Sequence, residues 1–171
     1  MSSIITYNGS TIVHFLLGGV GIVLSYGNST RVGYTLGLLY VLLAFSEMYV
    51  VMPLAVCPSC VYRRMKGALC IAGLNVLSAR VAKERAKKDF PKRAEGLFCA
   101  NNLYMASLIV PIAAMIPGMI FNFSGLLLLV FLVVAGLLIF RFFIIFPKLA
   151  CLHCKAKYAC PQAGAMGVRD K

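Results

Sequence analysis

Histidine and acidic residues are scarce in this sequence, and the scarcity narrows the kinds of site that it can build. Histidine occurs only as His14 and His153, and His153 lies beyond the last long apolar run. A bis-histidine haem within a helical bundle needs two imidazoles inside it, so haem ligated by this chain alone is not expected. No stretch resembles a phosphate-cradling glycine loop, a serine triad or a zinc hydrolase motif, so none of these sites is predicted.

Acidic residues number 5 against 17 Lys and Arg, which gives a formal net charge of +12. Hydrophobic residues make up 61% of the chain. This is well above the roughly half apolar content of a soluble domain, and it indicates an integral membrane protein. The basic residues flank the apolar runs, where anionic lipid and the rules of membrane topology explain them. We therefore expect membrane lipids, and no nucleic acid, as contacts of the basic segments.

Four apolar runs are long enough to cross a membrane as helices. They cover residues of about 11–26, 32–56, 102–121 and 124–146. The predicted fold is therefore all-α, an integral membrane four-helix bundle that forms a single domain over residues 1–171. A loop, 57–101, separates the second run from the third, and a tail, 147–171, follows the fourth. In the second run, Gly33 and Gly37 have the spacing of small residues that lets helices approach closely.

Lys and Arg are concentrated at one end of the predicted spans. The segment 57–100 holds ten of them and the segment 148–171 holds five, while the first and third connections hold only Arg31. By the positive-inside rule, the long loop and both termini are predicted to be cytoplasmic, in a plasma or inner membrane. Arg141 lies near the cytoplasmic end of the fourth run, and we expect its side chain to snorkel to the membrane interface.

Residues Gly67 to Lys88 are predicted to form a cytoplasmic amphipathic helix that lies along the membrane surface. Its apolar face comprises Cys70, Leu74, Leu77 and Val81, and its basic face comprises Arg80, Lys83 and Lys87. Basic side chains of this region are candidates for docking an acidic partner or lipid headgroups. They are Arg63, Arg64, Lys66, Arg80, Lys83 and Lys87.

All seven cysteines are assigned to the cytoplasmic end of the predicted bundle. They are Cys57, Cys60, Cys70, Cys99, Cys151, Cys154 and Cys160. CPSC, at 57–60, is followed by Cys70, and CLHC, at 151–154, is followed by Cys160. Two spans, a CxxC motif and a further cysteine thus occur twice, as a weak internal repeat. Thiols are kept reduced in the cytoplasm, which favours metal ligation or redox chemistry over disulfides.

The cysteine motifs predict a metal centre on the cytoplasmic face. The expected ligands are Cys57, Cys60, Cys151, Cys154 and Cys160, with Cys70, Cys99 and His153 as additional candidates. An iron-sulfur cluster is favoured, and these eight ligands are numerically enough for two four-iron clusters. A structural zinc site, with the two CxxC motifs as its four thiolate ligands, is one alternative. Reactive dithiols that exchange disulfides or transfer metal are another.

Glu47 and His14 are candidates for a proton-linked or quinone-binding site. An acidic residue inside a span is a functional candidate by default. Glu47 lies ten residues before Cys57, a rise of roughly 15 Å along a helix. His14 enters the membrane from the same side on the first helix, so the two side chains can meet directly or through water. The structural alternative is an interhelical hydrogen bond that fixes helix pairing.

Together these features predict a small integral membrane electron-transfer subunit, whether or not it catalyses a reaction itself. It would pass electrons between a cytoplasmic redox protein and a membrane quinone or a larger complex. Two alternatives stay open at this point. One is a non-enzymatic membrane anchor or assembly protein with structural zinc, and the other is a thiol-disulfide or metal-transfer membrane protein.

Overall fold

The computed structural model describes residues 2–27, 30–60, 62, 69–83, 100–152, 154, 157–159 and 167. Within this part of the chain, every regular element is helical. The α-helices are α1 (Ser2–Ser25), α2 (Thr30–Ser46), α3 (Met52–Ala55), α5 (Leu74–Val81), α7 (Ala100–Phe121) and α8 (Gly125–Phe140). There are also two π-helical stretches, η2 (Glu47–Val51) and η4 (Arg141–Cys151), and two short 3-10 turns, η3 (Cys57–Ser59) and η5 (Lys157–Ala159).

Four helical segments of the described chain are long and apolar enough to cross a membrane. They are Ile4–Ser25, Arg31–Ala55, Leu103–Phe121 and Gly125–Lys148. The predicted all-α fold is therefore confirmed for the described residues, and four of their helical segments fit membrane spans by length and composition. The first span begins at Ile4 rather than near Thr11, because the preceding residues continue the same helix.

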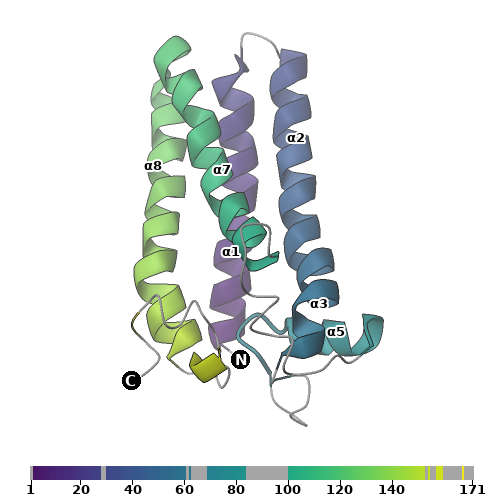
Figure 1. Ribbon diagram of the computed structural model, residues 1–171. Coiled ribbons are helices and arrows are strands. Elements are labelled where there is room, and N and C mark those ends of the chain that lie inside the picture. Colours follow the sequence, from purple (N-terminus) through teal and green to yellow (C-terminus); the bar gives the residue numbers. More distant parts are fainter. Residues whose placement is uncertain are drawn as a thin grey trace.

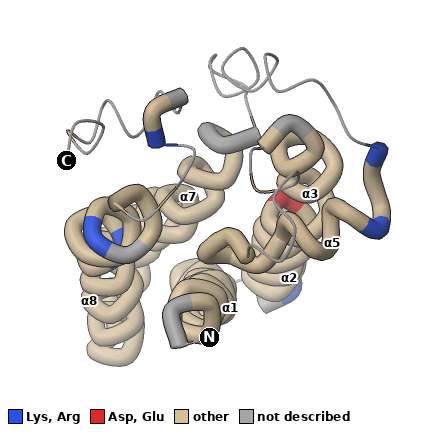
Figure 2. Tube along the Cα trace, turned by 90° about the horizontal axis from the view of Figure 1, so that it is seen from below, with Lys and Arg blue, Asp and Glu red and all other residues tan. Residues whose placement is uncertain are grey.

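Helix α1 is the central helix, because α2, α7 and α8 all pack against it. Seen from one end, α2 and α8 lie on opposite sides of α1 (Figure 2). Successive long helices run in opposite directions, so both termini lie at the same end of the bundle (Figure 1). The end of α3 and the end of η4 lie there too. We call it the cysteine end, because Cys57 follows α3 and Cys151 ends η4.

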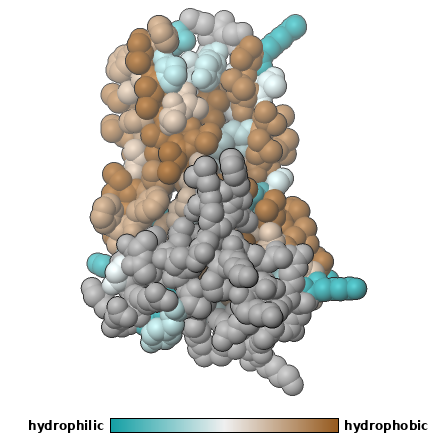
Figure 3. Space-filling model, viewed as in Figure 1, coloured by the Kyte–Doolittle hydropathy of each residue, from teal (hydrophilic) through white to brown (hydrophobic). Residues whose placement is uncertain are grey.

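The core between the helices is built from large apolar side chains. Phe15 on α1, Leu108 and Met115 on α7, and Leu127 and Val134 on α8 are fully buried. Many leucine and valine side chains stay exposed along α2 and α8, where the space-filling view shows apolar flanks (Figure 3). In a bilayer these exposed side chains meet lipid, so close packing and polar contacts hold the helices together.

Glycines bring α1 and α2 into close contact, as the spacing of Gly33 and Gly37 predicts. A Cβ added at Gly37 would lie 2.9 Å from the carbonyl oxygen of Gly19 and 2.6 Å from Cγ2 of Val23. A Cβ added at Gly33 would lie 3.0 Å from the carbonyl oxygen of Val23. The lack of side chains at these two positions therefore sets the distance between the helices.

Of the helix predicted over Gly67 to Lys88, the structure describes residues 69–83, and there α5 covers only Leu74–Val81. Residues 67–68 and 84–88 lie outside the described residues. Gly73 precedes it with a left-handed φ of 71°, which glycine adopts without strain. Cys70 therefore lies before the helix rather than on its apolar face. Leu74, Asn75 and Ser78 are buried, whereas Leu77 and Val81 are exposed. Because α5 packs against α3 and η3, its buried face is turned towards the protein. Leu77 and Val81 lie outside that buried face, and a position of the helix on the membrane surface stays a prediction.

The second and fourth spans end in the same way. Each π-helical stretch begins at a charged residue inside its span, Glu47 in η2 and Arg141 in η4. A proline follows six residues later in each, at Pro53 and Pro147, and cannot donate the α-helical hydrogen bond, which disrupts the regular α-helix there. The first cysteine of each CxxC motif follows four residues after the proline. Both segments thus share a charge-x5-Pro-x3-Cys-x2-Cys pattern, which sharpens the internal repeat.

We predict that Gly37→Ala lowers the free energy of unfolding by about 1–3 kcal/mol, because the added methyl group pushes α2 away from α1. Gly136→Ala on α8 is the control, since a Cβ there meets nothing within 4 Å. The measurement is unfolding by SDS in mixed micelles. Equal stability of the two variants would show that the contact between α1 and α2 does not depend on this glycine.

Candidate functional site

Arg141 turns into the bundle instead of snorkelling to the membrane interface, so the expectation from the sequence is wrong. Its side chain is 1% exposed. Nη1 donates to Tyr104 Oη at 2.5 Å, and Nη2 donates to Ser10 Oγ at 2.8 Å and Thr11 Oγ1 at 2.5 Å. Nη2 also donates to the Tyr7 carbonyl oxygen at 3.4 Å. Because α1 and α7 present these oxygens to the start of η4, the guanidinium is satisfied inside the protein.

Two aromatic rings cover the guanidinium group. Its Cζ lies 5.4 Å from the ring centroid of Tyr7 and 5.9 Å from that of Phe146, within the range of cation–π contacts. The Tyr7 hydroxyl also donates to Tyr104 Oη at 3.2 Å. We call the group the Arg141 cluster: Arg141, Tyr7, Ser10, Thr11, Tyr104 and Phe146. It joins α1, α7 and η4 in the half of the bundle that leads to the cysteine end.

His14 is buried on α1 and connects this helix to α7. Its Nε2 lies 2.9 Å from the carbonyl oxygen of Leu108. A carbonyl can only accept, so Nε2 is the protonated nitrogen. Nδ1 is buried and has no hydrogen-bond partner. His14 and Glu47 therefore do not form a direct hydrogen bond. The contact of His14 is instead an interhelical hydrogen bond that holds α1 against α7.

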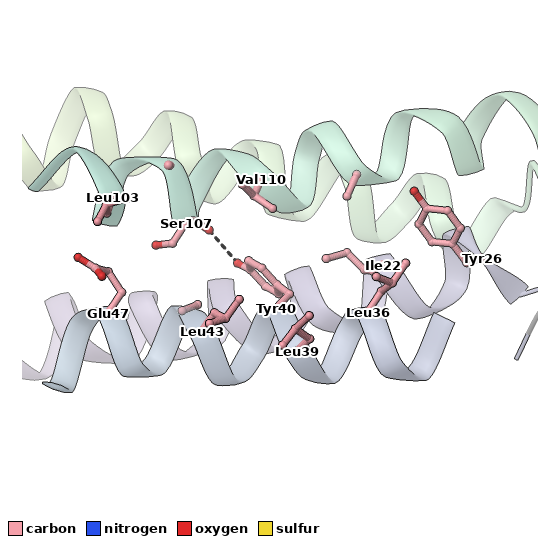
Figure 4. A pocket seen from close by; sticks show the side chains of 13 residues that line it. Ile22, Tyr26, Leu36, Leu39, Tyr40, Leu43, Glu47, Leu103, Ser107 and Val110 are labelled. Atoms are coloured by element: carbon pink, nitrogen blue, oxygen red, sulfur yellow. Dashed lines mark hydrogen bonds between the residues drawn. The ribbon is translucent and has the colours of Figure 1, made fainter. Parts of the chain in front are cut away.

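Glu47 stands at one end of a groove between α2 and α7 (Figure 4). The groove has a volume of about 540 Å³, and residues of α1 also line it. Glu47 and Leu103 lie at one end and Tyr26 at the other, with leucine and valine side chains between them (Figure 4). The groove is therefore elongated, apolar along most of its length and polar at the Glu47 end.

Other polar groups of the groove are already hydrogen-bonded. Tyr40 Oη donates to the carbonyl oxygen of Ser107 at 3.0 Å. Ser107 Oγ donates to the carbonyl oxygen of Tyr104 at 2.7 Å, which connects the groove wall to the Arg141 cluster. Glu47 Oε1, in contrast, is buried and has no hydrogen-bond partner. Glu47 thus has unused hydrogen-bonding capacity inside the groove.

The two CxxC motifs share one kind of backbone hydrogen bond at the cysteine end. The N–H of Cys60 donates to the carbonyl oxygen of Cys57 at 3.1 Å. The N–H of Cys154 donates to the carbonyl oxygen of Cys151 at the same distance, 3.1 Å. A turn closed between residues i and i+3 places their side chains on one side of the backbone. Each motif is thereby arranged to offer two thiols to one metal ion or cluster.

Cys70 belongs to a segment that packs beside the first motif. Helix α5, which follows Cys70, contacts η3, and both Cys70 and Cys57 pack against the same apolar core. The Cys70 N–H donates to Asn75 Oδ1 at 3.1 Å. Asn8 Nδ2 on α1 donates to the carbonyl oxygen of Ala72 at 3.1 Å, which holds the segment against the bundle. Three of the predicted ligands therefore lie on neighbouring segments.

In the part of the chain that the structure describes, no three His, Cys, Asp or Glu side chains are grouped closely enough to hold one metal ion. This includes the four thiols of the CxxC motifs, which are not gathered into a shared site. Further predicted site residues lie outside the described residues: Cys99, Cys160, His153, Arg63, Arg64, Lys66 and Lys87. Arg80 and Lys83 are described and exposed.

No protein-family model matches this chain, and neither does any curated protein or solved structure. Its function is therefore inferred from its own residues. Two features carry chemistry: the paired CxxC turns and the groove that ends at Glu47.

We predict that Tyr104→Phe lowers the free energy of unfolding by about 1.5–3 kcal/mol, because Nη1 of Arg141 loses its acceptor in a buried site. Tyr34→Phe is the matched control, since Tyr34 is 62% exposed on α2. Both variants are unfolded with SDS in mixed micelles. If Tyr104→Phe is as stable as Tyr34→Phe, the Tyr104 hydroxyl does not hold Arg141.

Proposed function

We propose that this protein is a small membrane electron-transfer subunit that carries one cysteine-ligated metal centre on each half of its cysteine end. The main support is the repeat. Each half closes its second span with the same charge-x5-Pro-x3-Cys-x2-Cys pattern, and each CxxC motif folds into a turn closed by the same hydrogen bond. Because each pair of thiols has its own backbone hydrogen bond, the repeat favours two equivalent metal centres.

The ligands divide naturally between the halves. We assign Cys57, Cys60, Cys70 and Cys99 to the first centre, and Cys151, Cys154, Cys160 and His153 to the second. The packing of α5 against η3 supports the inclusion of Cys70 in the first. Cys99, Cys160 and His153 enter from the sequence alone. Four ligands for each centre match the number that an iron-sulfur cluster requires.

Iron-sulfur clusters are favoured over a single zinc site. The zinc alternative uses the four CxxC thiols as one tetrahedral site. Those thiols are all described, and they are not grouped around one point. Two separate centres do not require the two CxxC motifs to meet at one point. Cys57, Cys60 and Cys70 are not grouped around one point either, so the first centre requires a cluster that draws these three thiols together when it binds. Two redox centres also explain why a small bundle would carry seven cysteines towards one end, since electrons can pass between clusters.

The cysteine end is proposed to face the cytoplasm, as the distribution of Lys and Arg indicates. There the basic loop would dock an acidic redox protein, other subunits of a membrane complex or lipid headgroups. Arg80 and Lys83, exposed on and just after α5, are well placed for such contacts. The reducing environment would keep the thiols available as ligands.

We predict that the double variant Cys57→Ser with Cys60→Ser retains about half of the iron of the wild-type protein, because four of eight ligands serve each cluster. The double variant Cys151→Ser with Cys154→Ser should do the same. Iron is measured after anaerobic purification in detergent, with circular dichroism to check helix content. Ser59→Ala and Leu152→Ala are matched controls, since they change each motif and keep its thiols.

Complete loss of iron from either double variant would show one shared site and contradict the proposal of two centres. Full retention by both would show that the CxxC thiols are not ligands. Zinc in place of iron would instead favour the alternative of a membrane anchor or assembly protein with a structural zinc site.

A second prediction concerns orientation. After metal removal, a membrane-impermeant thiol reagent should label the cysteines in opened cells and leave them unlabelled in intact cells, because the cysteine end faces the cytoplasm. Labelling is read by mass spectrometry of the purified protein. Rapid labelling of intact cells would place the cysteine end outside and favour disulfides over metal.

A further inference from the structure

We infer that the groove between α2 and α7 binds a membrane-soluble quinone or its hydroquinone, with the ring at Glu47 and the isoprenoid tail along the apolar walls. The volume of about 540 Å³ lies within the range of small-molecule sites, roughly 300–1,000 Å³. The groove is elongated, with its carboxyl group at one end and leucine side chains such as Leu39 and Leu43 along it (Figure 4). Its shape and polarity fit a molecule with a polar head and a long apolar tail.

Glu47 can hydrogen-bond to both redox forms of such a ring. As a carboxylate, its oxygens accept from the O–H of a hydroquinone, and as a carboxylic acid it donates to the carbonyl of a quinone. Its Oε1 is buried without a partner, whereas Tyr40 and Ser107 already donate to backbone carbonyl oxygens. A buried oxygen without a partner is uncommon, and a ligand hydroxyl would supply the missing donor.

The Glu47 carboxylate selects against anionic lipids. Fatty acids and phospholipids with a net negative headgroup are repelled by it. A quinone or hydroquinone ring is neutral and carries no such penalty. Glu47 also begins the π-helical stretch that leads to Cys57, so the ring would lie on the side of the bundle that carries the cysteines. Binding stands independently of the metal centres, whereas electron exchange with the ring rests on the proposed function.

The test uses the full-length protein in nanodiscs and a benzoquinone with one ten-carbon chain, together with its hydroquinone. Binding is followed by equilibrium dialysis with quantification of the probe. Glu47→Leu should weaken binding of both forms by about tenfold, because the hydrogen bond between the side chain and the ring oxygen is lost. Glu47→Gln keeps a donor and an acceptor of similar size and should bind both forms with an affinity close to that of the wild type.

A second pair of variants tests the place of binding. Ala106→Trp fills the groove and should abolish saturable binding, whereas Ala113→Trp, also at an exposed position of α7 but outside the groove, should leave it unchanged. Bound phospholipid, chain stoichiometry and iron content are measured on the same samples. Iron content reports on the metal centres alone, so loss of quinone binding and loss of metal are told apart.

Several outcomes would overturn the inference. One is quinone binding that survives both Glu47→Leu and Ala106→Trp. Another is the loss of tightly bound phospholipid, rather than of quinone, from Ala106→Trp. A change from dimer to monomer in Ala106→Trp, without saturable quinone binding by the wild type, would show that a second copy fills the groove.

Discussion

A guanidinium group inside a membrane bundle must find its hydrogen-bond acceptors within the protein, and at Arg141 this requirement determines how three helical segments meet. The acceptors come from α1 and α7, and the donor comes from the first residue of η4. All of the acceptors are neutral, so the cluster does not use the carboxylate of Glu47. The partly buried Glu47 of the second span thus stays available on the groove side, with its Oε1 atom buried and without a hydrogen-bond partner.

Arg141 and Glu47 occupy equivalent positions in the repeat, but their surroundings differ. Arg141 is held by the packed interior, while Glu47 faces a groove that opens between two helices. From each charged residue, a π-helical stretch containing or preceding a proline leads to a CxxC turn. The position of the thiols at the cysteine end therefore follows from how the spans pack. The Arg141 cluster thus positions the second thiol pair, and the contact of Gly33 and Gly37 on α2 with α1 positions the first.

Much of the fold follows from the sequence, because hydropathy and glycine spacing are local signals. The four spans and the close approach at Gly33 and Gly37 are read directly from them. The surroundings of Arg141 are not local, since its acceptors lie 37 to 134 positions away along the chain. Cations within membrane spans usually face the bundle interior, and this rule could have indicated that Arg141 turns inwards. The equal spacing from Glu47 to Pro53 and from Arg141 to Pro147 was also present in the sequence.

The groove and the start of α5 required the three-dimensional structure. A groove between α2 and α7 depends on the packing of helices far apart in sequence, so only its acidic residue could be singled out beforehand. The late start of α5 arises because Gly73 adopts a left-handed conformation, which interrupts an otherwise periodic apolar pattern. The thiol pairs were singled out as motifs from the sequence, and their role as ligands stays a prediction. Their union into one site was an assumption about packing that the described residues do not support.

The proposed function requires redox-active clusters at the cysteine end. The most direct measurement is the iron and acid-labile sulfide content of the wild-type protein purified without oxygen, with electron paramagnetic resonance after reduction. We expect iron and sulfide in equal amounts and a signal from reduced clusters. Stoichiometric zinc without sulfide, or a protein with no bound metal, would contradict the proposal.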